Sequence, residues 1–352
     1  MFGHSRDSRT SDDRAVPSTQ QRILGLAMGY QISQALYVAV RLAIPDHLSD
    51  GPRSAKQLAT ATHTDEGALY RVLRALASVG VFREHDRKKF SLAPDGETLC
   101  SQGSSIRDLV LWTLDPFHYK MYSELLTAAR TGTSVCAKVC GMSVFEYFAK
   151  APQIASIFDA AMTNVCRITA PAILEAYDFG PVRILVDVGG GEGALLLEIL
   201  KKYPRIRGIL AESPRCLAAA RKSVRAAKLE GRCVADTMDL FQRIPQGGDT
   251  YLLKNVLHDW ADVECIKILQ NCRAALSATP AETKRILVIE ALLSSGEYDS
   301  IAKRLDLDML VLATGRERTI DEFQFLFAKS GFQLARVIPT KSLFSLIEAV
   351  PL

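Results

Sequence analysis

The chain has 352 residues, of which 48% are hydrophobic and 23% are charged, and its formal net charge is +4. This length allows two domains, and the composition is that of an ordinary globular protein. Such a small net charge does not favour a nucleic-acid-binding surface.

The N-terminal segment, residues 1–19, is polar with mixed charges. We expect neither a signal peptide nor ordered structure there. From Arg22 to Leu48 apolar residues recur at helical spacing, and Pro45 is expected to close that helix. The apolar run from Ala35 to Ile44 is short and contains a charge, so no membrane span is predicted.

Residues 20–104 are predicted to form a winged-helix-like domain. Ser54 begins a short helix. The segment Thr64-Asp-Glu-Gly67 is expected to cap and open a second helix, which Gly80 ends. Two β-like stretches, 81–84 and 89–92, flank a charged turn and predict a hairpin. Helix, helix and hairpin in this order are typical of a winged helix.

Residues 105–176 are predicted to be helical throughout, with breaks near Pro116, Gly132 and Pro152. Aromatic and methionine side chains are concentrated in this region. Most are expected to form a core, and a few are expected to line an apolar ligand pocket. The pocket candidates are Trp112, Phe117, Met121, Phe158 and Met162.

The eight cysteines are scattered along the chain without a C-x-x-C pair. Cys136 and Cys140, the closest two, are interpreted as neighbours on one helix face rather than as zinc ligands. We therefore expect reduced thiols in a cytoplasmic protein, and no metal site.

Residues 177–352 alternate between strand and helix patterns, which predicts an α/β fold with a doubly wound, mostly parallel seven-stranded sheet. Helices are expected between successive members of the first five strands, and the last two strands are expected to form an antiparallel hairpin. The predicted strands are Ile184–Val188, Gly208–Glu212, Gly231–Asp236, Thr250–Asn255, Arg285–Ala291, Phe332–Pro339 and Phe344–Val350.

A glycine-rich turn follows the first of these strands. The strand ends at Asp187, the turn contains Gly189, Gly191 and Gly193, and an amphipathic helix begins next. A strand that passes through glycines into a helix lets the backbone approach a ligand at the helix N-terminus. A tight turn in an unrelated α/β domain would have the same pattern.

Two cofactors fit this turn. Gly189-x-Gly191-x-x-Ala194, with Glu212 about 20 residues on as the ribose ligand, matches a dinucleotide fingerprint. However, Glu192 would then repel the pyrophosphate. S-adenosylmethionine carries a cationic sulfonium and no phosphate, so the acidic Asp187 and Glu192 favour it. Glu212 can bind a ribose diol in either case.

Polar residues also follow the other predicted strands. They are candidate ligand contacts, because open α/β sheets bind ligands beyond the carboxyl ends of their strands. Asp239, followed by Leu240, can either meet an adenine amino group or cap a turn. Lys254 and Asn255 end the fourth strand.

His258 lies on the loop after the fourth strand, and Asp259 follows it; Asn255 and Asp259 are added to the candidate pocket residues. An imidazole that a carboxylate orients is a good general base near neutral pH. The candidates for that carboxylate are Glu290, at the end of the fifth strand, and Glu317. Glu317 could instead be a solvated charge at the end of a helix.

The chain resembles the large family of S-adenosylmethionine-dependent O-methyltransferases that includes plant caffeic acid and flavonoid, animal hydroxyindole and bacterial polyketide enzymes. The resemblance extends from about residue 20 to the C-terminal region. The segments that carry it are Leu185-Val-Asp-Val-Gly-Gly-Gly-Glu-Gly193, Asp239-Leu-Phe241, Gly247-Gly-Asp-Thr-Tyr-Leu-Leu-Lys-Asn-Val-Leu-His-Asp-Trp260, Asp306-Leu-Asp-Met-Leu310 and Gly315-Arg-Glu-Arg-Thr319.

The resemblance implies a class I, Rossmann-like methyltransferase fold and an N-terminal domain that forms an intertwined homodimer and helps to roof the partner's pocket. It implies that His258 deprotonates the acceptor hydroxyl between Glu290 and Glu317. It also implies cofactor contacts for the glycine loop and for Glu212, Asp239, Leu240 and Lys254.

Two departures from the family pattern concern the cofactor. Glu212-Ser-Pro stands where the family usually has Asp-Leu-Pro, and Met238-Asp239 stands where it has Gly-Asp. The longer Glu212 side chain changes the geometry at the ribose. Met238 could narrow the adenine site.

The expected reaction is methyl transfer to a phenolic or enolic hydroxyl of a small hydrophobic acceptor, which leaves S-adenosylhomocysteine. Relatives that bind S-adenosylmethionine but hydroxylate or decarboxylate their substrates are one alternative. A winged-helix regulator that responds to S-adenosylmethionine is another, but its second helix offers only Arg71 and Arg74 to a DNA groove. A dinucleotide oxidoreductase is a third.

Overall fold

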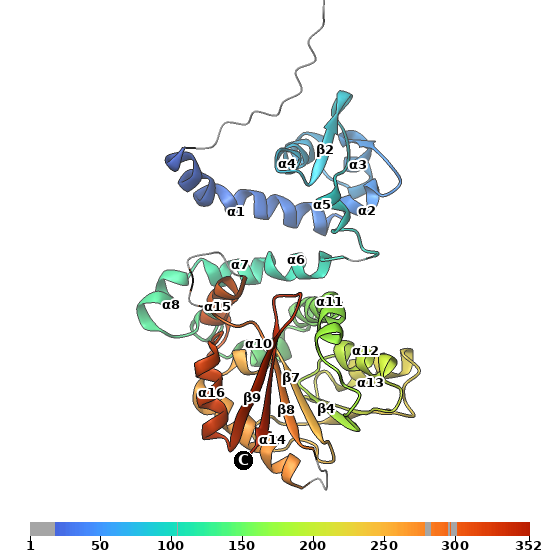
Figure 1. The fold of residues 1–352 in the computed structure, drawn as a ribbon. Coiled ribbons are helices and arrows are strands. Elements are labelled where there is room, and N and C mark those ends of the chain that lie inside the picture. The colour runs from blue at the N-terminus through green and yellow to red at the C-terminus, as the bar shows by residue number, and fades with distance from the viewer. Residues whose placement is uncertain (1–17, 104, 279–282, 295, 297–300) are drawn as a thin grey trace, which may run out of the picture. The chain divides into compact units, whose positions relative to one another are not determined.

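The computed structural model describes residues 18–103, 105–278, 283–294, 296 and 301–352. The chain divides into two compact units between Cys100 and Ser101 (Figure 1). The helical region from residue 105 to 176 belongs to the second unit. Residues 1–17, in the expected N-terminal tail, lie outside the described residues, and the first helix begins at Thr19.

In the first unit, helices α3 and α4 are followed by the hairpin of β2 and β3, in the order that the sequence predicted. Ser54 caps α3 and Asp65 caps α4 through their side-chain oxygens. A short strand, β1, which the sequence analysis did not predict, pairs with β3 beside the hairpin. The elements are α1 (Thr19–Arg41), α2 (Ile44–Leu48), β1 (Arg53–Ser54), α3 (Ala55–Thr62), α4 (Glu66–Ser78), β2 (Phe82–His85), η1 (Asp86–Lys88), β3 (Lys89–Leu92) and α5 (Pro94–Glu97).

The prediction that Pro45 closes one long helix is wrong. The first helix ends at Arg41, and Ala43 adopts a left-handed conformation with φ 52°. Pro45 instead lies in the first turn of α2, where its missing N–H costs no hydrogen bond.

Helix α1 leaves much of its apolar surface exposed, including Ile23, Leu24 and Leu26. By length and composition alone it could cross a membrane, although the sequence predicted no such span, and only 11% of its apolar window is buried. A helix whose apolar side chains pack against a second protein surface can have the same length and apolar composition.

The second unit begins with six helices. The three predicted breaks are present, and two further breaks, after Tyr122 and after Cys140, were not predicted. Asp115 accepts a hydrogen bond from the backbone of Phe117 and so caps the helix that starts at Pro116. Gly132, with φ 65°, ends another helix. The helices are α6 (Arg107–Thr113), α7 (Pro116–Tyr122), α8 (Leu125–Thr131), α9 (Val135–Cys140), α10 (Val144–Lys150) and α11 (Pro152–Ala176).

The seven predicted strands form one sheet in the order β6-β5-β4-β7-β8-β10-β9. The first five pair in parallel, and β10 pairs antiparallel with β8 and β9. The chain order reverses on either side of β4, and open α/β sheets generally bind ligands beyond the carboxyl ends of the strands at such a point. The strands are β4 (Ile184–Val188), β5 (Arg207–Glu212), β6 (Cys233–Thr237), β7 (Thr250–Lys254), β8 (Arg285–Glu290), β9 (Phe332–Pro339) and β10 (Ser345–Pro351).

The helix expected between β6 and β7 does not form. Residues 238–249 are all described, and they contain an isolated bridge from Asp239 to Arg243 but no helix. Pro245, Gly247 and Gly248 interrupt this segment, and such residues disfavour a continuous helix.

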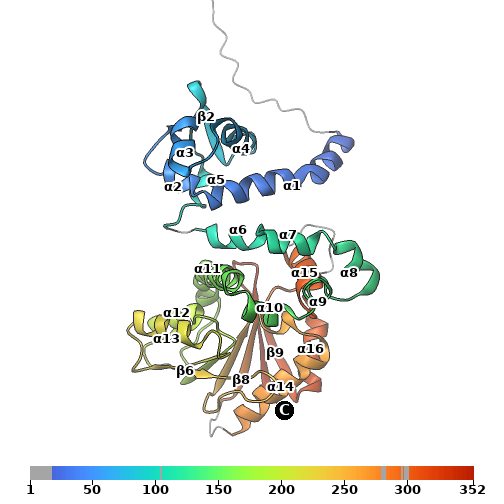
Figure 2. The same cartoon turned by 180° about the vertical axis from the view of Figure 1, so that it is seen from behind.

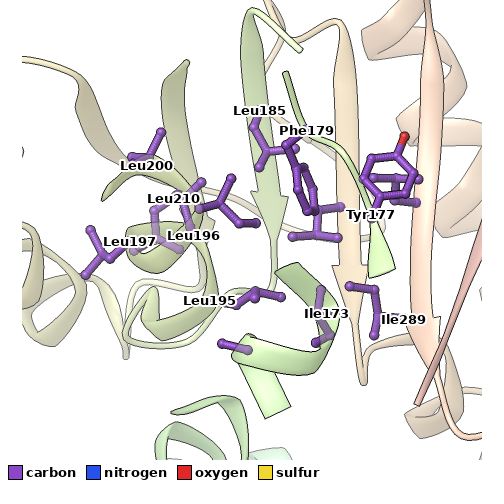
Figure 3. Packing of buried hydrophobic residues seen from close by; sticks show 14 of the residues in the cluster. Ile173, Tyr177, Phe179, Leu185, Leu195, Leu196, Leu197, Leu200, Leu210 and Ile289 are labelled. Carbon is purple, nitrogen blue, oxygen red and sulfur yellow. The ribbon is translucent and has the colours of Figure 1, made fainter. Parts of the chain in front are cut away.

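Alternate residues of the strands supply two hydrophobic cores. Leu185 and Leu287 pack against helices α11, α12 (Ala194–Lys202) and α13 (Leu217–Ala226) on one face, part of which Figure 3 shows. Val186 and Val288 pack on the other face, where α14 (Asp262–Ser277) and α16 (Ile320–Lys329) lie (Figures 1 and 2). Because both faces are covered, the strand ends remain for ligands.

Candidate active site

The glycine loop after β4 is packed tightly on its inner side. A Cβ atom on Gly190 would lie 2.3 Å from Oδ2 of Asp187, so no larger residue fits without a shift. Gly191 has φ 60°, and no described atom lies within 4 Å of the position that its Cβ would occupy. The loop therefore offers its backbone at close range to a ligand on that open side.

Two buried acids lie below this loop. Asp187 is 2% exposed, and its burial, reinforced by the charge of Glu212 and opposed by that of Lys254, raises its pKa to about 7. Burial also raises the pKa of Glu212, against hydrogen bonds from backbone N–H groups. Its Oε1 accepts from Gly191 at 3.2 Å, and its Oε2 accepts from Ser213. Glu212 is thus fixed against the glycine loop.

Lys254, at the end of β7, was predicted to contact the cofactor. Its charge acts on Asp187, which places it near the acid pair. Its ammonium lies 4.3 Å from the centre of the Phe344 ring and 3.5 Å from Oδ1 of Asn255. Asn255 has φ 53°, a left-handed conformation that asparagine tolerates better than most residues.

Of the two roles left open for Asp239, the structure shows the turn cap. Oδ1 of Asp239 accepts a hydrogen bond from the backbone N–H of Phe241 at 2.8 Å. Its side chain is otherwise exposed, while Leu240 is partly buried. Met238, noted as a departure from the family pattern, is buried close to Gly189.

His258 lies in η2 (Leu257–Asp259), just beyond β7, among three acidic side chains. Its Nδ1 lies 2.8 Å from Oε1 of Glu317 and 3.6 Å from Oε2 of Glu290. Its Nε2 lies 3.7 Å from Oδ1 of Asp259. Because Nδ1 bonds to a carboxylate, it carries the proton of the neutral ring, and Nε2 is the basic nitrogen.

The acids stabilise the protonated ring. Burial alone lowers the pKa of His258, but the charges of Glu290 and Asp259 and the hydrogen bond to Glu317 outweigh it and raise that pKa to about 10. Burial raises the pKa of Glu290 to about 7 and that of Asp259 to about 6, against the charge of His258. The acidic neighbours of His258 therefore favour its protonated ring.

Glu290 also holds the loop that carries the histidine. Its Oε1 accepts hydrogen bonds from the backbone N–H groups of Val256, Leu257 and His258 at 3.1, 3.0 and 3.4 Å. Its second oxygen, and the second oxygen of Glu317, are buried and have no hydrogen-bond partner among the described residues. The sequence predicted the proximity of this carboxylate but not its backbone contacts.

Gly315 and Arg318, which flank Glu317, hold the same loop from the other side. A Cβ on Gly315 would lie 2.1 Å from the carbonyl oxygen of His258. Arg318 is 1% exposed and donates to the carbonyl of Leu257 at 2.9 Å and of Trp260 at 2.8 Å. Of this motif, only Glu317 was predicted from the sequence to have a role in the site.

The predicted pocket residues from the helical region lie in one cluster. Trp112, Phe117 and Met121 are buried in it. Phe158 and Met162 pack against it and are only partly buried. Met121 is 0% exposed and therefore belongs to the core rather than to a pocket surface.

Trp260, which the sequence analysis did not assign to the pocket, connects this cluster to the loops. Its ring stacks on Phe145 at 5.6 Å between centres and meets the edge of Phe241 at 4.8 Å. The residue directly after Asp259 thus touches both the aromatic cluster and the turn of Asp239. A ligand that contacted these rings would meet flat, apolar surfaces.

His258, Glu290 and Glu317 could also hold a metal ion, because one ligand atom of each lies within 4.8 Å of the others. No metal site was predicted from the sequence. Two of these possible ligand atoms, Nδ1 of His258 and Oε1 of Glu317, are already hydrogen-bonded to each other. All eight cysteines, which are all described, have free thiols.

Two family models match the chain. Residues 122–333 match an O-methyltransferase domain, and residues 24–102 match an O-methyltransferase dimerisation domain. Together they include every residue of the glycine loop, the acid pair and the His258 cluster.

Known proteins match the chain over almost its whole length. It is 40% identical to the phenazine O-methyltransferase PhzM of Lysobacter antibioticus over 94% of this chain and 96% of that protein. The crystal structure of LaPhzM superposes with a TM-score of 0.90 at 39% identity, covering 96% of this chain and 100% of that one. The structure of CalO1, a methyltransferase in calicheamicin biosynthesis solved with S-adenosylhomocysteine, superposes with a TM-score of 0.80 at 33% identity. The match covers 96% of this chain and 100% of that one.

Proposed function

The chain belongs to the S-adenosylmethionine-dependent O-methyltransferases, and from that premise we propose that His258 is the general base for a hydroxyl of a flat, hydrophobic acceptor. Its seven-stranded sheet is the class I methyltransferase fold of that family. The observation that carries the proposal is the short bond from Nδ1 of His258 to Glu317, which leaves Nε2 to take a proton.

The residues at the carboxyl edge fit the cofactor. The open side of Gly191 admits a ligand to the backbone, and Glu212 presents a fixed carboxylate suited to a ribose diol. Asp187 adds negative charge, which suits a cation and opposes a pyrophosphate. When bound, S-adenosylmethionine supplies an electrophilic methyl group on a positively charged sulfur. Lys254, Asp239 and Leu240 are the remaining proposed cofactor contacts.

The base works in two stages. His258 must first lose the proton that its carboxylate neighbours stabilise. Its Nε2 then accepts the proton of the acceptor hydroxyl as the oxygen becomes a nucleophile, and Glu317 and Glu290 stabilise the imidazolium that forms. With the pKa of His258 near 10 and that of a free phenol also near 10, this transfer is close to balanced. Alignment of the acceptor by the pocket should supply most of the remaining acceleration.

The acceptor is proposed to be a polycyclic or aromatic natural product with a phenolic or enolic hydroxyl. The rings of Trp112, Phe158, Phe145 and Trp260 support this, because they present apolar faces and few polar groups. The relative named a phenazine O-methyltransferase supports the same class. Asn255 and Asp259 are proposed as its polar contacts.

A homodimer through the first unit is proposed as the working form. The chain carries an O-methyltransferase dimerisation domain, and the exposed apolar side chains of α1 need a covering surface. We also infer that the enzyme acts in the cytoplasm on small molecules.

The test is His258→Ala, assayed with hydroxylated phenazines and naphthols and S-adenosylmethionine. We expect turnover to fall about 100-fold to 10,000-fold, while affinity for S-adenosylhomocysteine, measured by calorimetry, stays unchanged. Mass analysis of the product should show one added methyl and no gain of oxygen or loss of carbon dioxide. Near wild-type turnover across the pH range would remove His258 as the base.

A further inference from the structure

A bidentate ion pair joins the turn after Glu212 to helix α11. Nη1 of Arg215 lies 2.7 Å from Oδ2 of Asp159, and Nη2 lies 2.9 Å from Oδ1. Arg215 belongs to the turn between β5 and α13, whereas Asp159 lies on α11, 56 residues earlier in the sequence. Figures 1 and 2 both draw α11 beside α12 and α13, on the same side of the sheet.

This pair is stronger than an ordinary surface ion pair. Two parallel N–H···O bonds fix both the distance and the plane of the guanidinium against the carboxylate. The side chains are 31% and 28% exposed, so water screens their attraction only in part. The charge of Asp159 and its hydrogen bond raise the pKa of Arg215, against its burial.

Arg215 also acts on the proposed ribose ligand. Burial raises the pKa of Glu212, and the positive charge of Arg215 is one of the effects that lower it. Glu212 in turn accepts a hydrogen bond from the backbone of Gly191 in the glycine loop. The charge of Arg215 therefore acts on Glu212, while its guanidinium is hydrogen-bonded to Asp159 on α11.

Asp159 lies at the border of the aromatic cluster. The ring of Phe158, its neighbour in the chain, meets Trp112 edge-on at 5.1 Å between centres, and it lies tilted against Phe148 at 4.8 Å. Met162, one helical turn further on, packs against the same cluster. The ion pair thus connects the end of β5, which is proposed to hold the cofactor, to the helix that forms part of the proposed acceptor wall.

We propose that Arg215 and Asp159 form a strap that closes the cofactor site on the Glu212 side, so that S-adenosylmethionine and S-adenosylhomocysteine bind more tightly and leave more slowly. The proposal rests on the ribose role proposed for Glu212. Both residues are positioning residues, since they act by holding α11 against the turn that follows the cofactor ligand.

Arg215 could instead act only through its charge on Glu212. Three variants distinguish this electrostatic role from the strap. Asp159→Asn breaks the pair and keeps the arginine charge. Arg215→Lys keeps the charge and loses the two-pronged bond. Arg215→Met removes both. A strap is weakened in all three variants, whereas a simple charge effect on Glu212 is lost only in Arg215→Met.

The experiment measures the affinity of the full-length enzyme for S-adenosylhomocysteine by calorimetry, and its dissociation rate by fluorescence of the two tryptophans. We expect each single variant to bind about threefold to tenfold more weakly and to release faster. The double variant Asp159→Asn with Arg215→Met should lose no more than the weaker-binding single variant. Lys201→Met is the matched control, because it breaks the 2.7 Å pair with Glu198 on α12, outside the strap.

Thermal unfolding separates a strap from a merely structural pair. The midpoint of the ligand-free variants should stay near that of the wild type, while the increase caused by S-adenosylhomocysteine should shrink. Unchanged affinity in Asp159→Asn and Arg215→Lys, or losses that simply add in the double variant, would overturn the proposal. Glu212→Gln tests the premise separately: if it leaves the affinity unchanged, the ribose assignment fails, whatever the strap variants show.

Discussion

Oε1 of Glu317 lies 2.8 Å from Nδ1 of His258, and this bond decides which ring nitrogen can act as a base. The bond fixes the proton of the neutral ring on Nδ1 and leaves Nε2 beside Asp259. The same carboxylate, together with Glu290 and Asp259, stabilises the positive charge of the protonated ring. Glu317 therefore sets the orientation of the proposed base and raises the pH at which its ring loses a proton.

The first prediction concerns the pH dependence of methyl transfer. The carboxylates raise the pKa of His258 to about 10, so the active, neutral ring is a minor form at pH 7. We expect kcat/KM to rise with pH until the ring is deprotonated. Glu317→Gln removes one negative charge, which lowers the pKa of His258, so the rise should end at a lower pH.

Both enzymes should be measured with one acceptor, because its own ionisation then contributes equally to both profiles. Glu198→Gln, on the exposed side of α12, is the control and should reproduce the wild-type profile. Coincident profiles for the wild type and Glu317→Gln would contradict the charge argument.

Much of the sheet could be predicted from the sequence because its signals are local. Apolar runs that end in Asp187, Glu212 and Glu290 identified the strands, and each strand end matches the structure to within a few residues. The missing helix between β6 and β7 shows the limit of this reasoning. The segment from Met238 to Asp249 is short, and its glycines and proline favour an irregular connection instead.

The contacts that hold the site were harder to predict, because they join residues far apart in the chain. Arg318 donates to the carbonyl of Leu257, 61 residues away, and Asp159 binds Arg215 across 56 residues. No sequence spacing predicts either pair, because each contact depends on how helices and loops pack in three dimensions. The stacking of Trp260 on Phe145 has the same origin.

The second prediction concerns the binding of S-adenosylmethionine at different pH values. Burial raises the pKa of Asp187 to about 7, so its carboxyl group is protonated in the ligand-free enzyme below that pH. A cationic ligand favours the ionised form, so binding should release a proton at pH 6 and tighten as the pH rises to about 7. Above that pH the affinity should level off.

Calorimetry in buffers of different ionisation enthalpy measures that proton release. S-adenosylhomocysteine lacks the sulfonium charge and should show a smaller pH dependence. Asp187→Asn should remove most of the difference between the two ligands. An affinity for S-adenosylmethionine that is constant from pH 5.5 to 8.5 would be incompatible with an acid titrating beside the cofactor.

The third prediction concerns Gly315, whose missing Cβ leaves room for the carbonyl of His258. Gly315→Ala would force the two backbones apart and should lower the free energy of unfolding by about 1 to 3 kcal/mol. Because the displaced segment carries His258, the proposed base, kcat should fall as well. Gly231→Ala is the control, since its Cβ would meet open space. Equal denaturation midpoints for the two variants would show that the loop can move without cost.

The last prediction concerns metal ions, since His258, Glu290 and Glu317 could in principle bind one. We expect methyl transfer to survive exhaustive dialysis against a chelator. The sulfur leaves as a neutral thioether, so no cation is needed to stabilise the leaving group. The imidazolium already offsets part of the negative charge of the surrounding carboxylates. Added zinc should instead inhibit, because it competes with the proton for His258. Activity that disappears on dialysis and returns with magnesium or zinc would replace the proposed proton-based site with a metal-based one.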